Sequence, residues 1–163
     1  TDSNNQGVRL YGSGDTTYQH ISATSNTLNF QQYYSSAWRT AAQIVGNSTA
    51  DFKFNSGYGS VATAYGCRAW VNFNGTGTVA IRASGNVTSI TDNGVGDYTV
   101  NFTTAMPDAN YSCVTSAART INNAFMSSIY YSGGLVAGSA RVRCWEDAGA
   151  AQDPNVFCVS IFR

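Results

Sequence analysis

One stretch, residues 67–83, limits what this chain can fold into more than any other, because it alternates apolar and polar residues and then turns back. Successive side chains of a β-strand point to opposite faces, so this pattern predicts two strands that share one core-facing side. Asn74-Gly75 lies between them, and such a pair adopts the positive backbone angles of a tight hairpin. We therefore predict a β-hairpin. Its inner-face residues are Cys67, Ala69, Val71, Phe73, Val79, Ile81 and Ala83.

The alternation continues along the C-terminal part of the chain. Further strands are expected at residues 87–91, 98–103, 110–118, 124–131, 139–146 and 156–162. Asp92–Asp97 has the glycines and asparagine of a turn, and Met106-Pro107 ends a strand, because proline cannot donate to a sheet. Short strands at this spacing are typical of a β-sandwich. We predict an all-β fold, an antiparallel β-sandwich of about eight strands, over residues 61–163.

Residues 1–60 have a different composition, rich in Gly, Asn, Ser, Thr and Gln, with small aromatic clusters such as Phe52-Lys53-Phe54. Such a segment buries too little apolar surface to fold alone. We predict an extended polar N-terminal segment, either stalk-like or a small β unit, that is ordered by copies of itself or by the domain that follows. Residues 36–45 fit a short helix capped by Ser36, and they fit a strand nearly as well.

Charge and hydropathy exclude some partners. The chain has nine basic and nine acidic residues, so its net charge is zero and we expect no nucleic acid as a partner. No apolar run approaches the roughly 20 residues of a membrane-spanning helix, so we expect no membrane insertion. The chain begins at Thr1 without Met, and we expect it to be part of a longer protein.

The potential metal ligands do not form a recognisable site. The cysteines show no C-x-x-C spacing, and we favour buried free thiols over a disulfide pair. They are Cys67, Cys113, Cys144 and Cys158. Asp147, Asp153 and Asn155 share one segment and offer oxygen ligands for Ca²⁺, but their spacing matches no known calcium loop. We therefore predict no metal and no cofactor.

Several strings of the sequence resemble one family. They are AWVNFNGTG at residues 69–77, ITDNG at 90–94, GDYTVNF at 96–102 and MPDANY at 106–111. In these strings the chain resembles the C-terminal receptor-binding domain of bacteriophage tail-fibre proteins. The resemblance implies a homotrimeric fibre end in the virion, made in the host cytoplasm. It also implies binding to a bacterial surface glycan or outer-membrane protein without catalysis.

Two other interpretations stay open, a tailspike-type polysaccharide depolymerase and a structural connector or decoration module of the virion. Glycoside hydrolysis needs two carboxyl groups about 5–10 Å apart across the scissile bond. Glu146 and Asp147 are adjacent and would point to opposite sides of an extended chain. The one histidine, His20, lies in the polar segment, and no G-x-S-x-G motif occurs. We therefore predict no catalytic residues.

Arginine and tryptophan recur opposite the predicted core faces, which favours a subunit interface over a platform for a sugar ring. The residues predicted at the interface are Arg68, Trp70, Arg141, Arg143, Trp145 and, from the final strand, Phe157. Loops with aromatic, amide and acidic side chains are the candidates for receptor contact. The residues predicted there are Arg119, Asn122, Asn123, Tyr130, Tyr131, Asp147 and Asp153.

Overall fold

The structure is a computed structural model that describes residues 6–11, 18–34, 37–46, 50–57, 59–119 and 125–163. Its regular elements are all β-strands, which confirms the predicted all-β fold. No helix in these residues is long and apolar enough to cross a membrane. The chain divides into two compact units, Thr1–Ala64 and Tyr65–Arg163.

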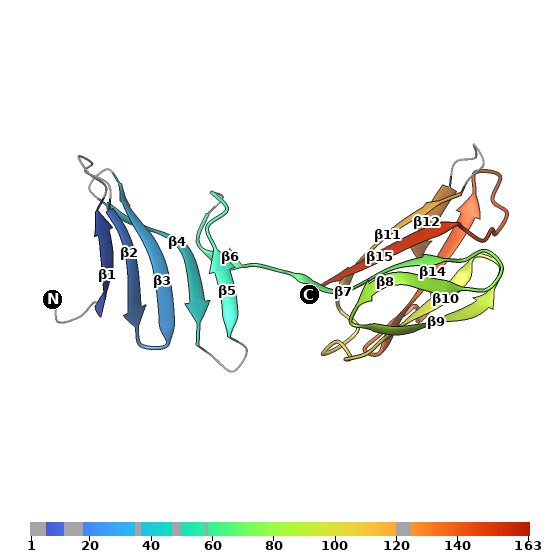
Figure 1. Ribbon diagram of the computed structural model, residues 1–163, viewed down its shortest axis with the longest axis horizontal. Coiled ribbons are helices and arrows are strands. Elements are labelled where there is room, and N and C mark those ends of the chain that lie inside the picture. Colours follow the sequence, from blue (N-terminus) through green and yellow to red (C-terminus); the bar gives the residue numbers. More distant parts are fainter. Residues whose placement is uncertain (1–5, 12–17, 35–36, 47–49, 58, 120–124) are drawn as a thin grey trace. The chain divides into compact units, whose positions relative to one another are not determined.

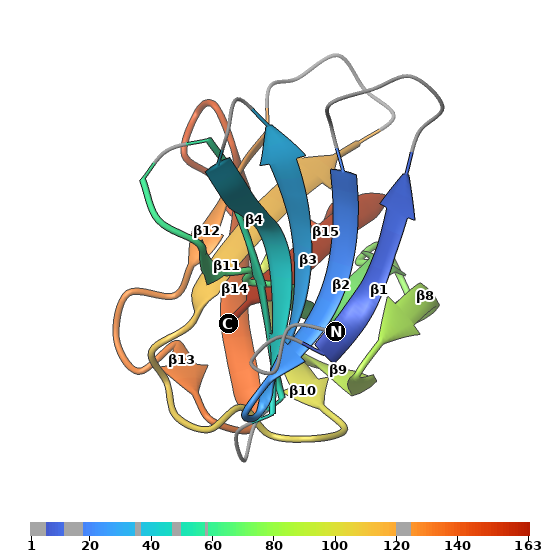
Figure 2. The same ribbon diagram turned by 90° about the vertical axis from the view of Figure 1, so that its left-hand side faces the viewer.

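The N-terminal unit is one antiparallel sheet of six strands in chain order (Figures 1 and 2). The strands are β1 (Gln6–Tyr11), β2 (Tyr18–Thr24), β3 (Thr27–Tyr34), β4 (Ala37–Val45), β5 (Asp51–Phe54) and β6 (Ala62–Thr63). Residues 37–45 form strand β4, so the alternative of a short helix at 36–45 was wrong. The bulge between Phe30 and Gln31 shifts the pairing of β3 with β4.

One face of this sheet is apolar. Val8 lies opposite Ile21 in the pairing of β1 with β2, and Ile44 lies opposite Phe52 in the pairing of β4 with β5. Directly opposed residues share a face, so these side chains form one surface. We call it the apolar face. Six of its side chains are 38–62% exposed, namely Val8, Leu10, Ile21, Ile44, Phe52 and Phe54.

The opposite face of the same sheet carries buried polar side chains. His20, Ser22 and Asn29 are buried there. The Ser22 hydroxyl donates to Gln31 Oε1 at 3.2 Å, and the Gln43 amide donates to Asn29 Oδ1 at 2.7 Å. This cross-strand hydrogen bonding satisfies most of the buried polar groups, although His20 Nδ1 has no partner among the described residues.

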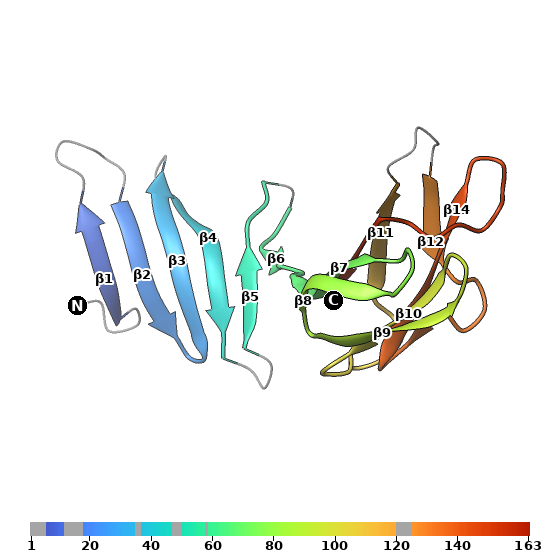
Figure 3. The same cartoon turned by 45° about the vertical axis from the view of Figure 1, so that its right-hand side comes forward.

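The C-terminal unit contains two antiparallel sheets (Figures 1 and 3). The β14 sheet has the order β12-β14-β10-β9 with β13 also paired to β14, and the β15 sheet has the order β11-β15-β7-β8. The strands are β7 (Cys67–Asn74), β8 (Ala80–Gly85), β9 (Val87–Gly94), β10 (Asp97–Phe102), β11 (Ser112–Ala118), β12 (Phe125–Ile129), β13 (Leu135–Val136), β14 (Ser139–Glu146) and β15 (Val156–Phe162). The short β13 is the strand that the sequence pattern missed.

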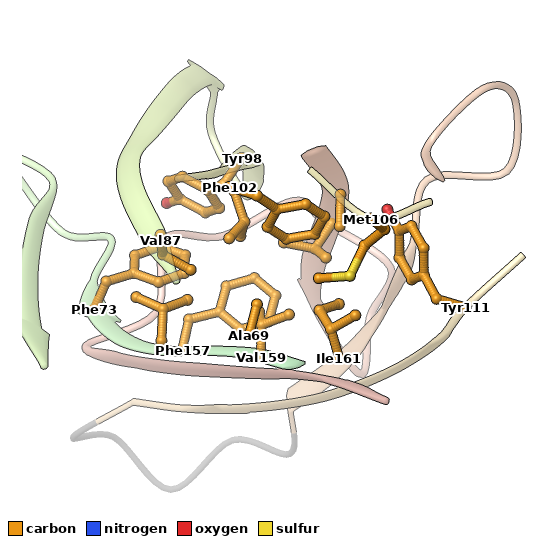
Figure 4. Close-up of a cluster of buried hydrophobic side chains, with 14 of the residues drawn as sticks. Ala69, Phe73, Val87, Tyr98, Phe102, Met106, Tyr111, Phe157, Val159 and Ile161 are labelled. Atoms are coloured by element: carbon orange, nitrogen blue, oxygen red, sulfur yellow. The ribbon is translucent and has the colours of Figure 1, made fainter. Parts of the chain in front are cut away.

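The core of this unit lies between the inner faces of both sheets (Figure 4). The ring centroids of Phe73 and Phe157 are 5.2 Å apart, and Tyr98 meets Phe73 edge-on at 5.2 Å. Phe157 is 0% exposed in the single chain, so its side chain lies in the core of this unit. Its prediction as an interface residue was wrong, because β15 is apolar on both sides and alternation alone did not identify the inner one.

The predicted hairpin at residues 67–83 is present as β7 and β8, but its turn is longer than expected. β8 begins only at Ala80, and Gly77 rather than Gly75 has a positive φ, at 64°. A Cβ atom at Gly75 would lie 2.5 Å from the Tyr98 hydroxyl oxygen, so this glycine permits close packing instead of a special turn angle. The turn predicted at Asp92–Asp97 is shorter than expected, because β9 continues to Gly94 and only Val95 and Gly96 connect it to β10.

All four cysteines are free thiols, but they differ in environment. Cys67 is exposed and Cys144 is buried. Burial raises the pKa of Cys113 to about 11 and, as the largest cause, the pKa of Cys144 to about 12. These two thiols therefore act as small core side chains at neutral pH.

Candidate binding site

The outer face of the β14 sheet collects charged and aromatic side chains from separate strands. Tyr98 and Val142 point into the core, so alternation turns their neighbours Asp97 and Arg143 outward. Asp97 lies directly opposite Arg143 in the pairing of β10 with β14. We call this surface the polar platform. Its members are Asp97, Thr99, Asn101, Tyr130, Arg141, Arg143 and Trp145.

Arg141 is fully paired on this platform. Its Nε donates to Asp97 Oδ1 at 2.8 Å and its Nη2 donates to Asp97 Oδ2 at 2.7 Å. The hydrogen bonds from Arg141 hold the pKa of the Asp97 carboxyl below its ordinary value. This bidentate pair fixes the guanidinium plane and neutralises the Arg141 charge.

Tyr130 lies beneath two guanidinium groups. The Arg141 Cζ atom is 4.1 Å from the centroid of the Tyr130 ring, and the Arg143 Cζ atom is 5.1 Å from it. Tyr131 stacks on Tyr130 with centroids 5.4 Å apart and is 86% exposed. The structure thus brings two arginines predicted at an interface together with two tyrosines predicted to contact a receptor.

The alignment of β12 with β14, which sequence reasoning did not consider, explains why Tyr130 lies beside the two arginines. The Tyr130 N–H donates to the carbonyl oxygen of Arg141 at 2.9 Å, which extends the pairing of β12 with β14 beyond Ile129. Pairing Tyr130 with Arg141 places both side chains on the outer face. The alternation of β12 and β14 was visible in the sequence, but their mutual alignment was not.

Arg143 differs from Arg141 in its partners. Within the described residues its guanidinium makes no hydrogen bond and no ion pair within 4.0 Å, although it contributes electrostatically to the lowered pKa of Asp97. Arg143 and Trp145 line a pocket of about 230 Å³ together with Cys144, Gly149 and Ala151. The pocket therefore combines an open guanidinium group with an indole ring.

The remaining predicted interface residues lie elsewhere. Arg68 and Trp70 belong to β7 in the β15 sheet, and both are exposed. Trp70 lies opposite Ser160 of β15 and packs closely against Gly85. The residues predicted at one interface are therefore divided between two sheets.

The residues predicted to contact a receptor also separate. Arg119 Nη1 donates to Gln152 Oε1 at 2.8 Å, so this arginine tethers the segment before β15. Asp147 is exposed in the turn after β14. Asn122 and Asn123 lie outside the described residues.

Asp153 has an internal role that sequence reasoning missed. Its Oδ1 accepts hydrogen bonds from the Tyr98 hydroxyl at 2.5 Å and from the Gly96 N–H at 2.8 Å. Burial, followed by the hydrogen bond to Asp153, raises the pKa of Tyr98 well above its ordinary value. This carboxylate connects the segment before β15 to the core and to the turn between β9 and β10. Within the described residues, no three metal-ligating side chains are grouped together.

No family model matches this chain, and no curated protein is similar to it in sequence. The chain is similar in structure to the phiAB6 tailspike, crystallised in complex with three-repeated oligosaccharides of Acinetobacter baumannii surface polysaccharide. The sequence identity is 14% and the TM-score is 0.49. The match covers 99% of this chain and 37% of the tailspike chain, so this chain spans well under half of that protein.

The Asp97–Arg141 pair yields a prediction for stability and its pH dependence. Asp97→Asn is expected to lower the free energy of unfolding by about 1 kcal/mol at pH 7, because a bidentate pair is lost whose Arg141 partner is partly exposed and screened by water. The folded-state pKa of Asp97 is lowered, so the pair contributes above the ordinary aspartate pKa and its contribution is lost as the pH falls through the lowered value. The difference from wild type should therefore shrink as the pH falls below the ordinary aspartate pKa.

Urea denaturation at pH 7 and at acidic pH measures this difference. Asp92→Asn is the matched control, since Asp92 Oδ1 accepts a hydrogen bond from the Gly94 N–H that asparagine can also accept. This control should change the free energy of unfolding by less than about 0.5 kcal/mol. A loss from Asp97→Asn that stayed constant down to pH 2 would contradict the assignment.

Proposed function

We propose that this chain is a non-catalytic receptor-binding part of a bacteriophage tail fibre that binds a glycan on the bacterial surface through the polar platform. The resemblance at residues 69–77 and 90–111 supports the class of protein. The observation that carries the binding mode is the stack of Arg141 and Arg143 on Tyr130, with Tyr131 exposed beside it. On this proposal Arg141, Arg143 and Trp145 serve binding rather than subunit contact.

The rest of the platform also suits a glycan. The Asn101 amide donates to the hydroxyls of Ser89 at 3.1 Å and Thr91 at 2.9 Å, and the Asn93 amide donates to Thr99 at 2.9 Å. These pairs hold amides and hydroxyls in defined positions on the same sheet as the aromatic rings. Sugar hydroxyls and ring faces match fixed polar groups and aromatic faces, and sites on strands are more precise than sites on loops.

The proposed assembly is a homotrimer, and the apolar face of the N-terminal sheet is the surface that copies of the chain would cover. A sheet with one apolar face needs a second layer, and the described residues of this unit form a single sheet. The six exposed apolar side chains defined above carry no charge, so burying them between copies removes apolar surface from water. A second copy is present whenever the chain is made, which suits a face that needs permanent cover.

A binding assay on whole bacteria tests the proposed function. Fluorescently labelled protein is applied to a panel of strains with different surface polysaccharides, with and without periodate, which cleaves the vicinal diols of sugars. Binding should be confined to some strains and lost after periodate treatment. If binding survived periodate but was lost after proteolysis of the bacterial surface, the receptor would instead be an outer-membrane protein. New reducing ends from purified polysaccharide would support a depolymerase.

Tyr131→Ala is expected to reduce binding to the recognised strain at least about tenfold, since an exposed aromatic face typically contributes more than 1 kcal/mol to binding. Tyr131 is 86% exposed, so its removal should leave the fold intact. Tyr65→Ala is the matched control, because Tyr65 is 74% exposed and lies outside the platform. Equal binding by both variants would contradict the proposed site.

A further inference from the structure

The two arginines of the polar platform differ in a way that identifies the class of ligand. Arg141 is neutralised by Asp97 through two hydrogen bonds of 2.8 and 2.7 Å. Arg143 makes no hydrogen bond or ion pair within the described residues, so its planar set of N–H donors is open. Such a fork matches the two oxygens of a carboxylate.

We propose that the pocket beside Arg143 binds an acidic sugar, with the sugar carboxylate on the Arg143 guanidinium and the ring against Trp145. This inference rests on the proposed function and adds the chemical class of the glycan, namely a uronic acid residue. Trp145 and Arg143 are two positions apart on β14, so both side chains point to the same side of the strand.

The size of the pocket restricts what it can hold. Its volume is about 230 Å³, below the roughly 300–1,000 Å³ of pockets that bury a drug-sized ligand. It therefore suits one sugar ring of a longer chain, while the neighbouring units extend over Tyr130 and Tyr131. The exposed Tyr131 ring lies beside Tyr130 and offers the next stacking surface.

The Tyr130 ring supports the Arg143 guanidinium before any ligand binds. The Arg143 Cζ atom lies 5.1 Å from the centroid of the Tyr130 ring. Arg141 and Tyr131 also pack against this ring. A guanidinium held over an aromatic ring loses less side-chain freedom when a carboxylate binds than a free arginine does. Preorganisation of this kind favours a bidentate ligand over a diffuse counter-ion.

The acidic groups around the pocket leave Arg143 available. Asp97 is engaged by Arg141, and Glu146 lies three positions from Arg143 on the opposite side of β14. Asp147 is exposed in the turn that follows the strand, where water screens its charge. The carboxylate of Asp153 accepts from Tyr98 and Gly96 instead of from Arg143.

Titration of the full chain with defined oligosaccharides tests the inference. The probes are trigalacturonic acid, the neutral trisaccharide maltotriose and glucose 6-phosphate, followed by chemical shift changes of the backbone amides around residues 143–151. Trigalacturonic acid should bind at least tenfold more tightly than maltotriose, and added salt should weaken it. Equal affinity for trigalacturonic acid and maltotriose overturns the inference, and so does binding of glucose 6-phosphate without binding of trigalacturonic acid.

Substitution of the arginine provides the second measurement. Arg143→Gln should weaken the binding of trigalacturonic acid at least tenfold. Arg82→Gln removes the same charge from an exposed position on the β15 sheet and should leave the binding of trigalacturonic acid unchanged. Equal effects of both substitutions overturn the inference. If the chain binds bacteria but no uronate, the proposed function holds and this inference is overturned. If it binds uronate but no bacteria, this inference holds and the proposed function is overturned.

Discussion

Phe157→Ala is expected to lower the free energy of unfolding of the C-terminal unit by about 3–5 kcal/mol, the usual cost of truncating a fully buried aromatic side chain. The ring is 0% exposed, stacks on Phe73 at 5.2 Å and meets Tyr98 edge-on at 6.0 Å. Two aromatic rings, one from each sheet, thus lose their contact with the third. The free energy of unfolding of a domain is typically only about 5–15 kcal/mol, so this variant should lose much of its native stability.

Hydrogen exchange of the full chain under increasing denaturant measures the loss, because peptides from β7, β10 and β15 report on the C-terminal unit alone. Phe162→Ala is the matched control on the same strand, since Phe162 is exposed on the outer face. It should cost less than about 1 kcal/mol. Similar losses for both variants would contradict the assignment of Phe157 to the core.

The strands of the C-terminal unit could be predicted because their alternation is strict. The predicted strands at residues 139–146 and 156–162 have the same bounds as β14 and β15. On β14 each inner apolar residue is followed by an outer polar one, which also identified the outward direction of Arg141 and Arg143. On β15 both sides are apolar, and there the assignment of Phe157 failed.

The N-terminal sheet was harder to predict, because its polar side chains pair with one another across strands. Three such residues are neighbours on one face, namely Ser22, Asn29 and Gln43. In the linear sequence they have the composition of a hydrophilic loop. Their hydrogen bonds exist only after the strands are aligned. The segment 37–45 was ambiguous for another reason, since a bulge opposite Phe30 and Gln31 interrupts its alternation.

The candidate site was predicted in parts, and its assembly was not. Alternation identified Arg143 and Trp145 as an outward-facing row, and composition identified Tyr130 as a residue suited to binding. Their meeting depends on the pairing of β12 with β14, and the Asp97–Arg141 pair joins residues 44 positions apart. Such alignments follow from the packing of the whole sandwich, because each strand could pair in several registers on local pattern alone.

Phe52→Glu is expected to have the largest effect on assembly and to convert the proposed trimer into monomers at micromolar concentration. Phe52 lies on the apolar face, opposite Ile44 and half exposed in the single chain. A carboxylate buried there without a partner costs several kcal/mol in each protomer, and three protomers carry it. In an isolated chain the same side chain would remain in water, so the sheet itself should be affected much less.

Light scattering after size-exclusion chromatography gives the mass of each species directly. Val95→Glu introduces the same charge at an exposed apolar position in the turn between β9 and β10, and it should remain trimeric. A wild-type chain that is monomeric at micromolar concentration would contradict the proposed assembly outright. If both variants kept the wild-type mass, the copies would have to meet through another surface. The apolar face would then need a different cover, because a six-stranded sheet with this many uncovered apolar side chains is prone to aggregation in water.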